Sequence, residues 1–364
     1  MNFIVDFTLY NIVMVIIVLS VLIFCHELGH FLLAKLFKVK VLKFALGFGH
    51  RIVWKQIGDT EYSIRWILLG GFVKLLGEDD DEEMKKLPPE EAARALDRQS
   101  VLKKIAILAA GSIFNLILAV LIFTGTYLFR GEEIYHLRIK TVILNEPAQK
   151  AGFLSGDFIT KVDGKIIKTP FLREYLLFKA GIPVQMTVLR NGELLNIKVI
   201  PREEPVEIAG EIIKIGYIGI ESEEKVVEEV PLGPFDSLLR GVQKTWSVIE
   251  FTLVALKRLL QGQLPASSVG GILQIGKTVG DVARHSIFDV IPITAILSIT
   301  IGLLNLFPIP ILDGSLIVLA LIEAIRGKSL SNNQKEWIFK IGLAMIIALM
   351  LFATKNDIVR FLKN

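Results

Sequence analysis

The sequence VLSVLIFCHELGHFLLAKLF, residues 18–37, is apolar enough to cross a membrane, yet it holds two histidines and a glutamate near its centre. Ionisable groups inside a bilayer are costly unless they have partners or a function. His26 and His30 are four residues apart, so on a helix they lie about 40° apart and both imidazoles can reach one metal ion. Glu27 is placed to take a proton from metal-bound water. The segment therefore predicts a transmembrane helix that carries part of a hydrolytic metal site.

The composition predicts a chain that crosses the membrane several times. It has 364 residues, 52% of them hydrophobic, and a mean hydropathy of +0.55. Charged residues make up 21% and gather between long apolar runs, as in membrane helices joined by extramembrane segments. The net charge of only +4 gives no indication of nucleic acid as a partner, and a single cysteine excludes a disulfide within the chain.

Four apolar segments approach the length of about 20 residues that a membrane-spanning helix needs. They cover residues 9–37, residues 104–129, a stretch that begins near residue 287, and residues 337–353. The third is too long for one simple span and is interrupted by the sequence NLFPIPILDG, residues 305–314. We expect the polypeptide to depart from helical geometry at this interruption.

A catalytic zinc site needs three protein ligands and an open position, so a further ligand is expected on another membrane segment. Asp313 is the clear candidate, because it is the only carboxylate between Asp289 and Glu323 in the third apolar segment. Pro308 and Pro310 disfavour a helical backbone in the residues just before Asp313. Irregular backbone at membrane depth is tolerated only where protein or a water-filled cavity surrounds it, which is what an intramembrane hydrolytic site requires.

Regions outside the spans are expected to contain β structure. Residues 38–103 mix short β-prone runs with Gly-Asp and Gly-Gly turn signals. Residues 131–225 alternate strands around a short helix, and residues 226–285 begin with an amphipathic helix suited to the membrane surface. Lysines crowd the ends of the first connecting loop, so the positive-inside rule places that loop in the cytoplasm and residues 131–286 outside.

HELGH in the first span and NLFPIPILDG near the last together resemble the site-2 protease family of intramembrane zinc metalloproteases. The chain is most similar to the bacterial RseP/RasP type, the regulator of sigma-E proteases or RIP metalloproteases, over nearly its whole length. The resemblance implies one catalytic Zn²⁺ held by His26, His30 and Asp313, with Glu27 as the acid and base. It also implies that Asn305 holds the substrate backbone near the scissile bond.

Further resemblances concern substrate handling. Gly111 and Asn115 in GSIFN match the family's GxxxN element beside the active site, where Gly111 allows close helix approach and Asn115 can hydrogen bond a strand or an oxyanion. Residues 45–78 correspond to a membrane-associated β-hairpin that could receive the substrate as an added strand. We assign Gly70, Gly71 and Phe72 to this presentation, with simple packing as an equal alternative.

The sequence EPAQKAGFLSGDFITKVDGKII, residues 146–167, is similar to bacterial PDZ domains, which bind peptides by adding them to a sheet edge. The implied fold is a polytopic α-helical membrane protein with four transmembrane helices, a membrane-associated β-hairpin region and one inserted extracytoplasmic PDZ domain. We divide the chain as follows: the first transmembrane helix with HExxH at 1–37; a cytoplasmic β region and charged segment at 38–103; the second transmembrane helix with GxxxN at 104–130; the PDZ domain at 131–225; the amphipathic region at 226–285; the third transmembrane segment with the LDG motif at 286–327; and the fourth transmembrane helix with the tail at 328–364.

The function that the resemblance implies is intramembrane zinc endopeptidase activity in the bacterial inner membrane, with the active site toward the cytoplasm. Its partners would be the lipid bilayer, single-pass membrane proteins such as anti-sigma factors or signal-peptide remnants, and a trimmed substrate terminus at the PDZ domain. One alternative is a membrane-anchored metalloprotease that cuts soluble segments. The other is an inactive scaffold that works through its PDZ groove, which would require a broken metal site.

Overall fold

The structure is a computed structural model that describes residues 9–77, 87–166, 172, 175–208, 211–328 and 330–363. The chain divides into two compact units. A helical unit comprises residues 1–125, 238–254 and 269–364, and a strand-rich unit comprises residues 126–237 and 255–268. Part of the charged segment that follows the predicted β region, and the last residue of the PDZ-like sequence 146–167, lie outside the described residues.

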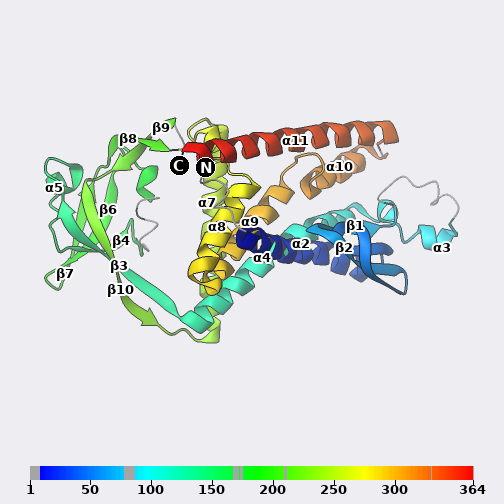
Figure 1. The fold of residues 1–364 in the computed structure, drawn as a ribbon, viewed down its shortest axis with the longest axis horizontal. Helices are drawn as coiled ribbons and strands as arrows, with labels where there is room; N and C mark the ends of the chain where they lie inside the picture. Colours follow the sequence, from blue (N-terminus) through cyan, green and yellow to red (C-terminus); the bar gives the residue numbers. More distant parts are fainter. Residues whose placement is uncertain are drawn as a thin grey trace. The chain divides into compact units, whose positions relative to one another are not determined.

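The predicted spans are present as helices long and apolar enough to cross a membrane (Figure 1). In chain order they are α2 (Leu9–Leu36), α4 (Val101–Arg130), the segment Ile287–Leu306 formed by η4 (Ile287–Asp289) and α9 (Val290–Leu306), and part of α11 (Asn332–Lys363). The third apolar stretch divides as expected, because α9 ends before Pro308 and a separate helix, α10 (Asp313–Arg326), begins after Pro310. The helix α11 is longer than the predicted span because charged residues extend it at both ends.

Between α2 and α4, the chain forms one long antiparallel hairpin, β1 (Val41–Ile57) with β2 (Thr60–Leu75), in place of several short strands. Register shifts occur along β1 as far as Val53, which explains why the sequence lacks a continuous two-residue alternation. Beyond these shifts, side chains near the turn such as Val53, Trp54 and Trp66 are more than half exposed. The short helices α3 (Pro89–Ala92) and η2 (Leu96–Arg98) complete this connection.

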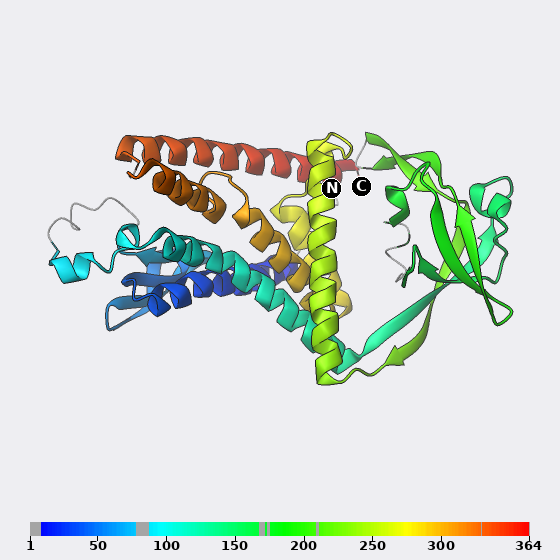
Figure 2. The same cartoon turned by 180° about the vertical axis from the view of Figure 1, so that it is seen from behind.

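Two further helices contribute to the helical unit. The predicted amphipathic helix is α7 (Pro234–Leu260), drawn in front in Figure 2. In its first half, Gly241 lies against Val120 and Thr124 of α4. The second, α8 (Ile272–His285), follows the short η3 (Ala266–Ser268) and packs on α2. The amino terminus of α8 is capped by Asp357 of α11, which is fully buried and accepts hydrogen bonds from the amides of Gly271 and Gln274 at 2.8 and 3.1 Å.

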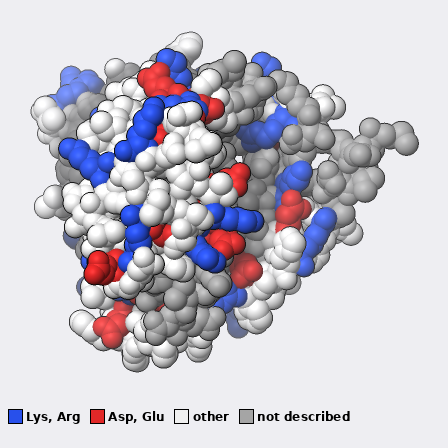
Figure 3. Space-filling model, turned by 90° about the vertical axis from the view of Figure 1, so that its left-hand side faces the viewer, with Lys and Arg blue, Asp and Glu red and all other residues white. Residues whose placement is uncertain are grey.

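The strand-rich unit is built on a sheet with the order β10-β3-β4-β6-β7, and β5 pairs with β4. Its strands are β3 (Glu132–Val142), β4 (Phe158–Val162), β5 (Lys165–Ile166), β6 (Val184–Arg190), β7 (Glu193–Val199) and β10 (Ile220–Val230). The helix α5 (Pro147–Ala151) and a separate hairpin of β8 (Arg202–Ile208) and β9 (Glu211–Tyr217) complete the unit. Phe153, Ile139 and Met186 are among the largest side chains in its core. On the face drawn in Figure 3, basic and acidic side chains are interspersed.

A buried ion pair fixes the turn between α5 and β4. Asp157 is 1% exposed and accepts hydrogen bonds from two Arg190 nitrogens at 2.7 Å and from the Leu154 amide at 2.9 Å. Burial raises the pKa of Asp157, but the hydrogen bonds from Arg190 and Leu154 outweigh burial and hold that pKa below its usual value. The charged carboxylate is therefore part of the folded structure of this unit.

The strand-rich unit is expected to lose stability as the pH falls below about 4, the ordinary pKa of aspartate. The pKa of Asp157 is lower in the folded state than in the unfolded state. Its contribution to the free energy of unfolding is therefore complete above that pH, and it is lost as the pH falls through the folded-state pKa. Hydrogen exchange of the β4 and β6 amides in the full chain, corrected for intrinsic rates, measures this loss. Asp157→Asn should flatten the pH dependence, and an unchanged slope in that variant would contradict the assignment.

Candidate metal centre

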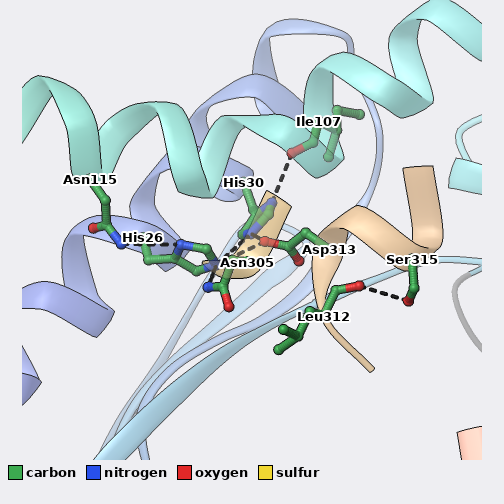
Figure 4. Close-up of polar contacts among 8 residues, drawn as sticks. All are labelled: His26, His30, Ile107, Asn115, Asn305, Leu312, Asp313 and Ser315. Atoms are coloured by element: carbon green, nitrogen blue, oxygen red, sulfur yellow. Dashed lines mark hydrogen bonds and ion pairs between the residues drawn. The ribbon is translucent and has the colours of Figure 1, made fainter. Parts of the chain in front are cut away.

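Three side chains from two helices converge at one point in the helical unit (Figure 4). His26 and His30 lie one helical turn apart on α2 and are 7% and 8% exposed. Asp313 is the first residue of α10 and is partly buried. The structure thus brings together the residues that the HELGH and LDG motifs predicted as metal ligands, although they are far apart in the sequence.

The distances among these side chains suit a tetrahedral metal ion. Asp313 Oδ2 lies 3.0 Å from His26 Nε2 and 3.4 Å from His30 Nε2, and the two Nε2 atoms are 3.2 Å apart. Ligands bonded to zinc at about 2.0–2.1 Å in a tetrahedron lie roughly 3.3–3.4 Å from one another. Two nitrogens and one carboxylate oxygen are also a common ligand set of catalytic zinc, which leaves the fourth position open. The residues present therefore fit a catalytic zinc ion.

Two glycines allow helix α4 to pack directly on the imidazoles. A Cβ atom at Gly29 would lie 2.7 Å from the carbonyl carbon of Ala110, so the backbones of α2 and α4 are in close contact here. A Cβ atom at Gly111 would lie 2.7 Å from both Cε1 and Nε2 of His26 and would also overlap His30. Gly111, expected to allow close helix approach, lies against the two candidate metal-ligating histidines themselves. Gly29 could have been found from the sequence, since a glycine inside a helix costs stability and needs a reason.

The segment that delivers Asp313 is irregular, as Pro308 and Pro310 predicted. Phe307 is extended, and Ile311 has a φ of 82°, a value that β-branched residues rarely adopt. Pro310 packs on α11, where a Cβ atom at Gly342 would lie 2.7 Å from the Pro310 carbonyl carbon. This contact and the backbone conformation of Ile311 fix where α10 begins and hence where the carboxylate of Asp313 lies.

Glu27 lies beside the ligand cluster and against strand β2. A Cβ atom at Gly71 would lie 3.3 Å from Glu27 Cγ, and the backbone of Val73 also reaches the Glu27 carboxyl group. Gly71 and Val73 of β2 therefore lie against the predicted general base. Gly70 and Phe72 instead contact Phe48, whose ring stacks on that of Phe72 with centroids 6.3 Å apart.

Three groups surround the imidazoles. Asn305, near the end of α9, places its Nδ2 atom 3.3 Å from His26 Nε2, the ring nitrogen that faces Asp313. Asn115 of α4 is fully buried and places Nδ2 3.4 Å from His26 Nδ1. The carbonyl oxygen of Ile107 lies 2.8 Å from His30 Nδ1 (Figure 4). Sequence reasoning missed Ile107, because every residue has a backbone carbonyl and no side-chain pattern marks the one that is used.

Helices long enough to span a membrane, with a His-His-Asp cluster and an adjacent glutamate, define a membrane metalloprotease. Residues 14–349 match the model of Peptidase family M50. The chain is 35% identical over 354 residues to a protein of Agrobacterium fabrum named "Putative zinc metalloprotease Atu1380", covering 94% of each chain. It is 32% identical over 391 aligned positions to Metalloprotease MmpA of Caulobacter vibrioides, covering 97% of this chain and 96% of that protein. The chain belongs to peptidase family M50, the site-2 proteases, and is a zinc metalloprotease of the membrane.

Proposed function

We propose that this protease cleaves single-pass membrane proteins within or near their transmembrane segment, with zinc held by His26, His30 and Asp313. The observation that carries the proposal is the position of the ligands. The histidines belong to a span-length helix, and Asp313 follows directly on another, across a proline-broken turn. A site built this way can act on a peptide that enters from the bilayer more readily than on a soluble loop.

A zinc ion held by these residues would supply Lewis-acid chemistry toward water and the scissile carbonyl. Glu27 adjoins His26 and faces strand β2, so it is positioned to take the proton of the attacking water and return it to the leaving amine. The amide of Asn305 is within reach of the same point and can donate a hydrogen bond to the substrate backbone.

A peptide bond in a helix is a poor substrate, because its amide and carbonyl are already hydrogen bonded within the helix. Adding the substrate as a strand beside β2 would unwind it and bring it past Glu27. Gly71 supports this role, since its missing side chain lets the β2 backbone lie close to Glu27. Gly70 and Phe72 would then shape the strand through their contacts with Phe48 rather than touch the substrate.

The strand-rich unit is proposed to be a PDZ domain that binds a peptide terminus. Strand β10 is at the edge of the sheet, and a groove of about 380 Å³ lies beside its beginning. Leu172 and Leu176 contribute apolar side chains to the groove, while Ile218 and Gly219 form the loop that leads into β10. An edge strand, a facing apolar wall and a glycine loop are what strand addition of a trimmed substrate terminus requires.

The proposed setting is the bacterial inner membrane, with the metal site toward the cytoplasm and the strand-rich unit outside. The lysines at the ends of the first connecting loop support this orientation by the positive-inside rule. The substrates would be the remains of membrane proteins after another protease has removed their outer domain, such as anti-sigma factors or signal-peptide remnants. This proposal rests on the family resemblance and on the site's place between apolar helices.

Removal of the metal tests the function directly. The full chain in proteoliposomes is expected to hold about one zinc per chain, to lose cleavage of a single-pass reporter on treatment with a chelator, and to recover it with zinc. Mass spectrometry of the products should place the cut within or next to the transmembrane segment. Efficient cleavage of a soluble peptide with the same sequence, and none of the membrane-inserted reporter, would favour the anchored protease for soluble segments instead.

A further inference from the structure

One face of α4 presents three residues, each one turn from the next, to the two imidazoles. Ile107 offers its carbonyl to His30, Gly111 leaves room for both rings, and Asn115 offers its amide to His26. We propose that Asn115 is a positioning residue that accepts the Nδ1–H of His26 and thereby keeps Nε2 of that ring free for zinc. The inference rests on the proposed role of His26 as a zinc ligand.

The argument begins with the nitrogen that faces the metal position. In both histidines the Nε2 atom faces Asp313 Oδ2, so a metal ion there would take the Nε2 lone pairs. A neutral imidazole with a free Nε2 lone pair must carry its proton on Nδ1. Each Nδ1 then needs a hydrogen-bond acceptor, and that acceptor orients the ring as well as fixing the tautomer.

His30 already has such an acceptor. The Ile107 carbonyl oxygen, 2.8 Å from His30 Nδ1, can only accept a hydrogen bond, so it holds the proton on Nδ1. Because this partner belongs to the backbone of α4, no side-chain rotation can remove it. The tautomer of His30 is thus set by the helix packing alone.

His26 depends on a side chain for the same purpose. In the orientation drawn, Asn115 turns Nδ2 toward His26 Nδ1 at 3.4 Å, while among the described residues its Oδ1 atom is buried without a hydrogen-bond partner. The oxygen and nitrogen of an amide have nearly the same shape, so their assignment follows from the hydrogen-bond network. Turning the amide by 180° gives Oδ1 a partner and gives His26 Nδ1–H its acceptor. The same turn leaves Nε2 of His26 available to the metal.

The surroundings of Asn115 hold it in this role and away from the substrate. Its side chain is fully buried, and its backbone carbonyl accepts a hydrogen bond from Ser298 Oγ of α9 at 2.7 Å. Gly302 allows the same helix to close over it, since a Cβ atom there would lie 3.2 Å from Asn115 Cβ. The family resemblance predicts a substrate contact for Asn115, whereas this geometry directs the amide at a zinc ligand.

Zinc affinity, measured without substrate by competition with a chelator, tests the inference on the full chain in detergent. Asn115→Leu keeps the size of the side chain but has no acceptor, and it is expected to weaken zinc binding about 10- to 100-fold, as for the loss of other outer partners of ligating histidines. Asn115→Asp keeps an acceptor and is expected to bind zinc much as the wild type does. Ser298→Ala, which disturbs the packing around Asn115 without removing its amide, is the matched control.

The outcomes separate the possible roles of Asn115. Unchanged zinc affinity in Asn115→Leu, or equal weakening in the Leu and Asp variants, would overturn the inference in favour of substrate binding or packing. Should either variant not fold, ¹⁵N spectra of the metal-free wild type decide: His26, identified by the loss of its signals in His26→Gln, must carry its proton on Nδ1, and a neutral ring with the proton on Nε2 would overturn the inference. Failure of the wild type to bind zinc at all would instead count against the proposed function.

Discussion

Replacing Glu27 by glutamine is expected to lower the cleavage rate of a single-pass substrate by about 100- to 10,000-fold while zinc remains bound, the usual range for removing a general base or acid. Glutamine has nearly the size of glutamate but cannot take a proton from water. Glu27 is not one of the three side chains that form the candidate ligand group, so the His-His-Asp cluster should stay intact. Initial rates in proteoliposomes, together with the zinc content of the same samples, measure both parts of this expectation.

Cys25 provides the matched control, because it lies two residues before Glu27 on the same helix and its Sγ is directed at the Phe114 carbonyl oxygen, 3.6 Å away. Cys25→Ala should therefore keep a rate close to that of the wild type. Wild-type turnover in Glu27→Gln would exclude Glu27 as the base. Loss of zinc from that variant would show instead that the side chain supports the ligands.

Adding one methyl group at Gly111 is expected to abolish activity by a different route. The new Cβ atom would lie 2.7 Å from two atoms of the His26 ring and would also overlap His30, so both ligands must move. Helix α4 cannot easily move away from the imidazoles, because its backbone packs closely against α2 at Gly29. We expect Gly111→Ala to lose more zinc affinity than the roughly 10- to 100-fold typical of outer partners, since two ligands are displaced together.

Gly125→Ala is the control for Gly111→Ala. It makes the same change on the same helix, but a Cβ atom there would meet nothing within 4 Å. Its zinc affinity and activity should equal those of the wild type, with a helix of slightly higher intrinsic propensity. A Gly111→Ala protein that binds zinc normally would mean that the close contact between α4 and the imidazoles is not kept in the membrane.

The sequence was sufficient for the parts of the fold that depend on composition and proline. Long apolar runs predict the spans, and Pro308 and Pro310 predict the break before Asp313, because both act through local physical effects. The family resemblance predicted a β-hairpin in this region, but the length and register of β1 and β2 could not be predicted, because the register shifts hide the alternation that marks a strand.

The candidate site shows the same division. His26, His30 and Glu27 share one motif and Asp313 is isolated among apolar residues, so side-chain chemistry alone predicts them. The role of Ile107 depends on how closely α4 approaches α2, which only the packed structure shows. Gly29 stands out in the sequence as a glycine inside a helix, but its contact with Ala110 does not. Asn115 was found through the GxxxN element of the family resemblance, but the atom it faces depends on the helix face that the packing selects.

The division of the ligands between α2 and α10 has a thermodynamic consequence. A metal ion held by His26, His30 and Asp313 ties an early helix to a late one, and the unfolded chain has no such arrangement of ligands. Zinc at about 100 times its dissociation constant would add about 2.7 kcal/mol to the free energy of unfolding. The bound ion would thus act as a cross-link between α2 and α10, and these two helices should separate more easily in the apoprotein than in the zinc-loaded enzyme.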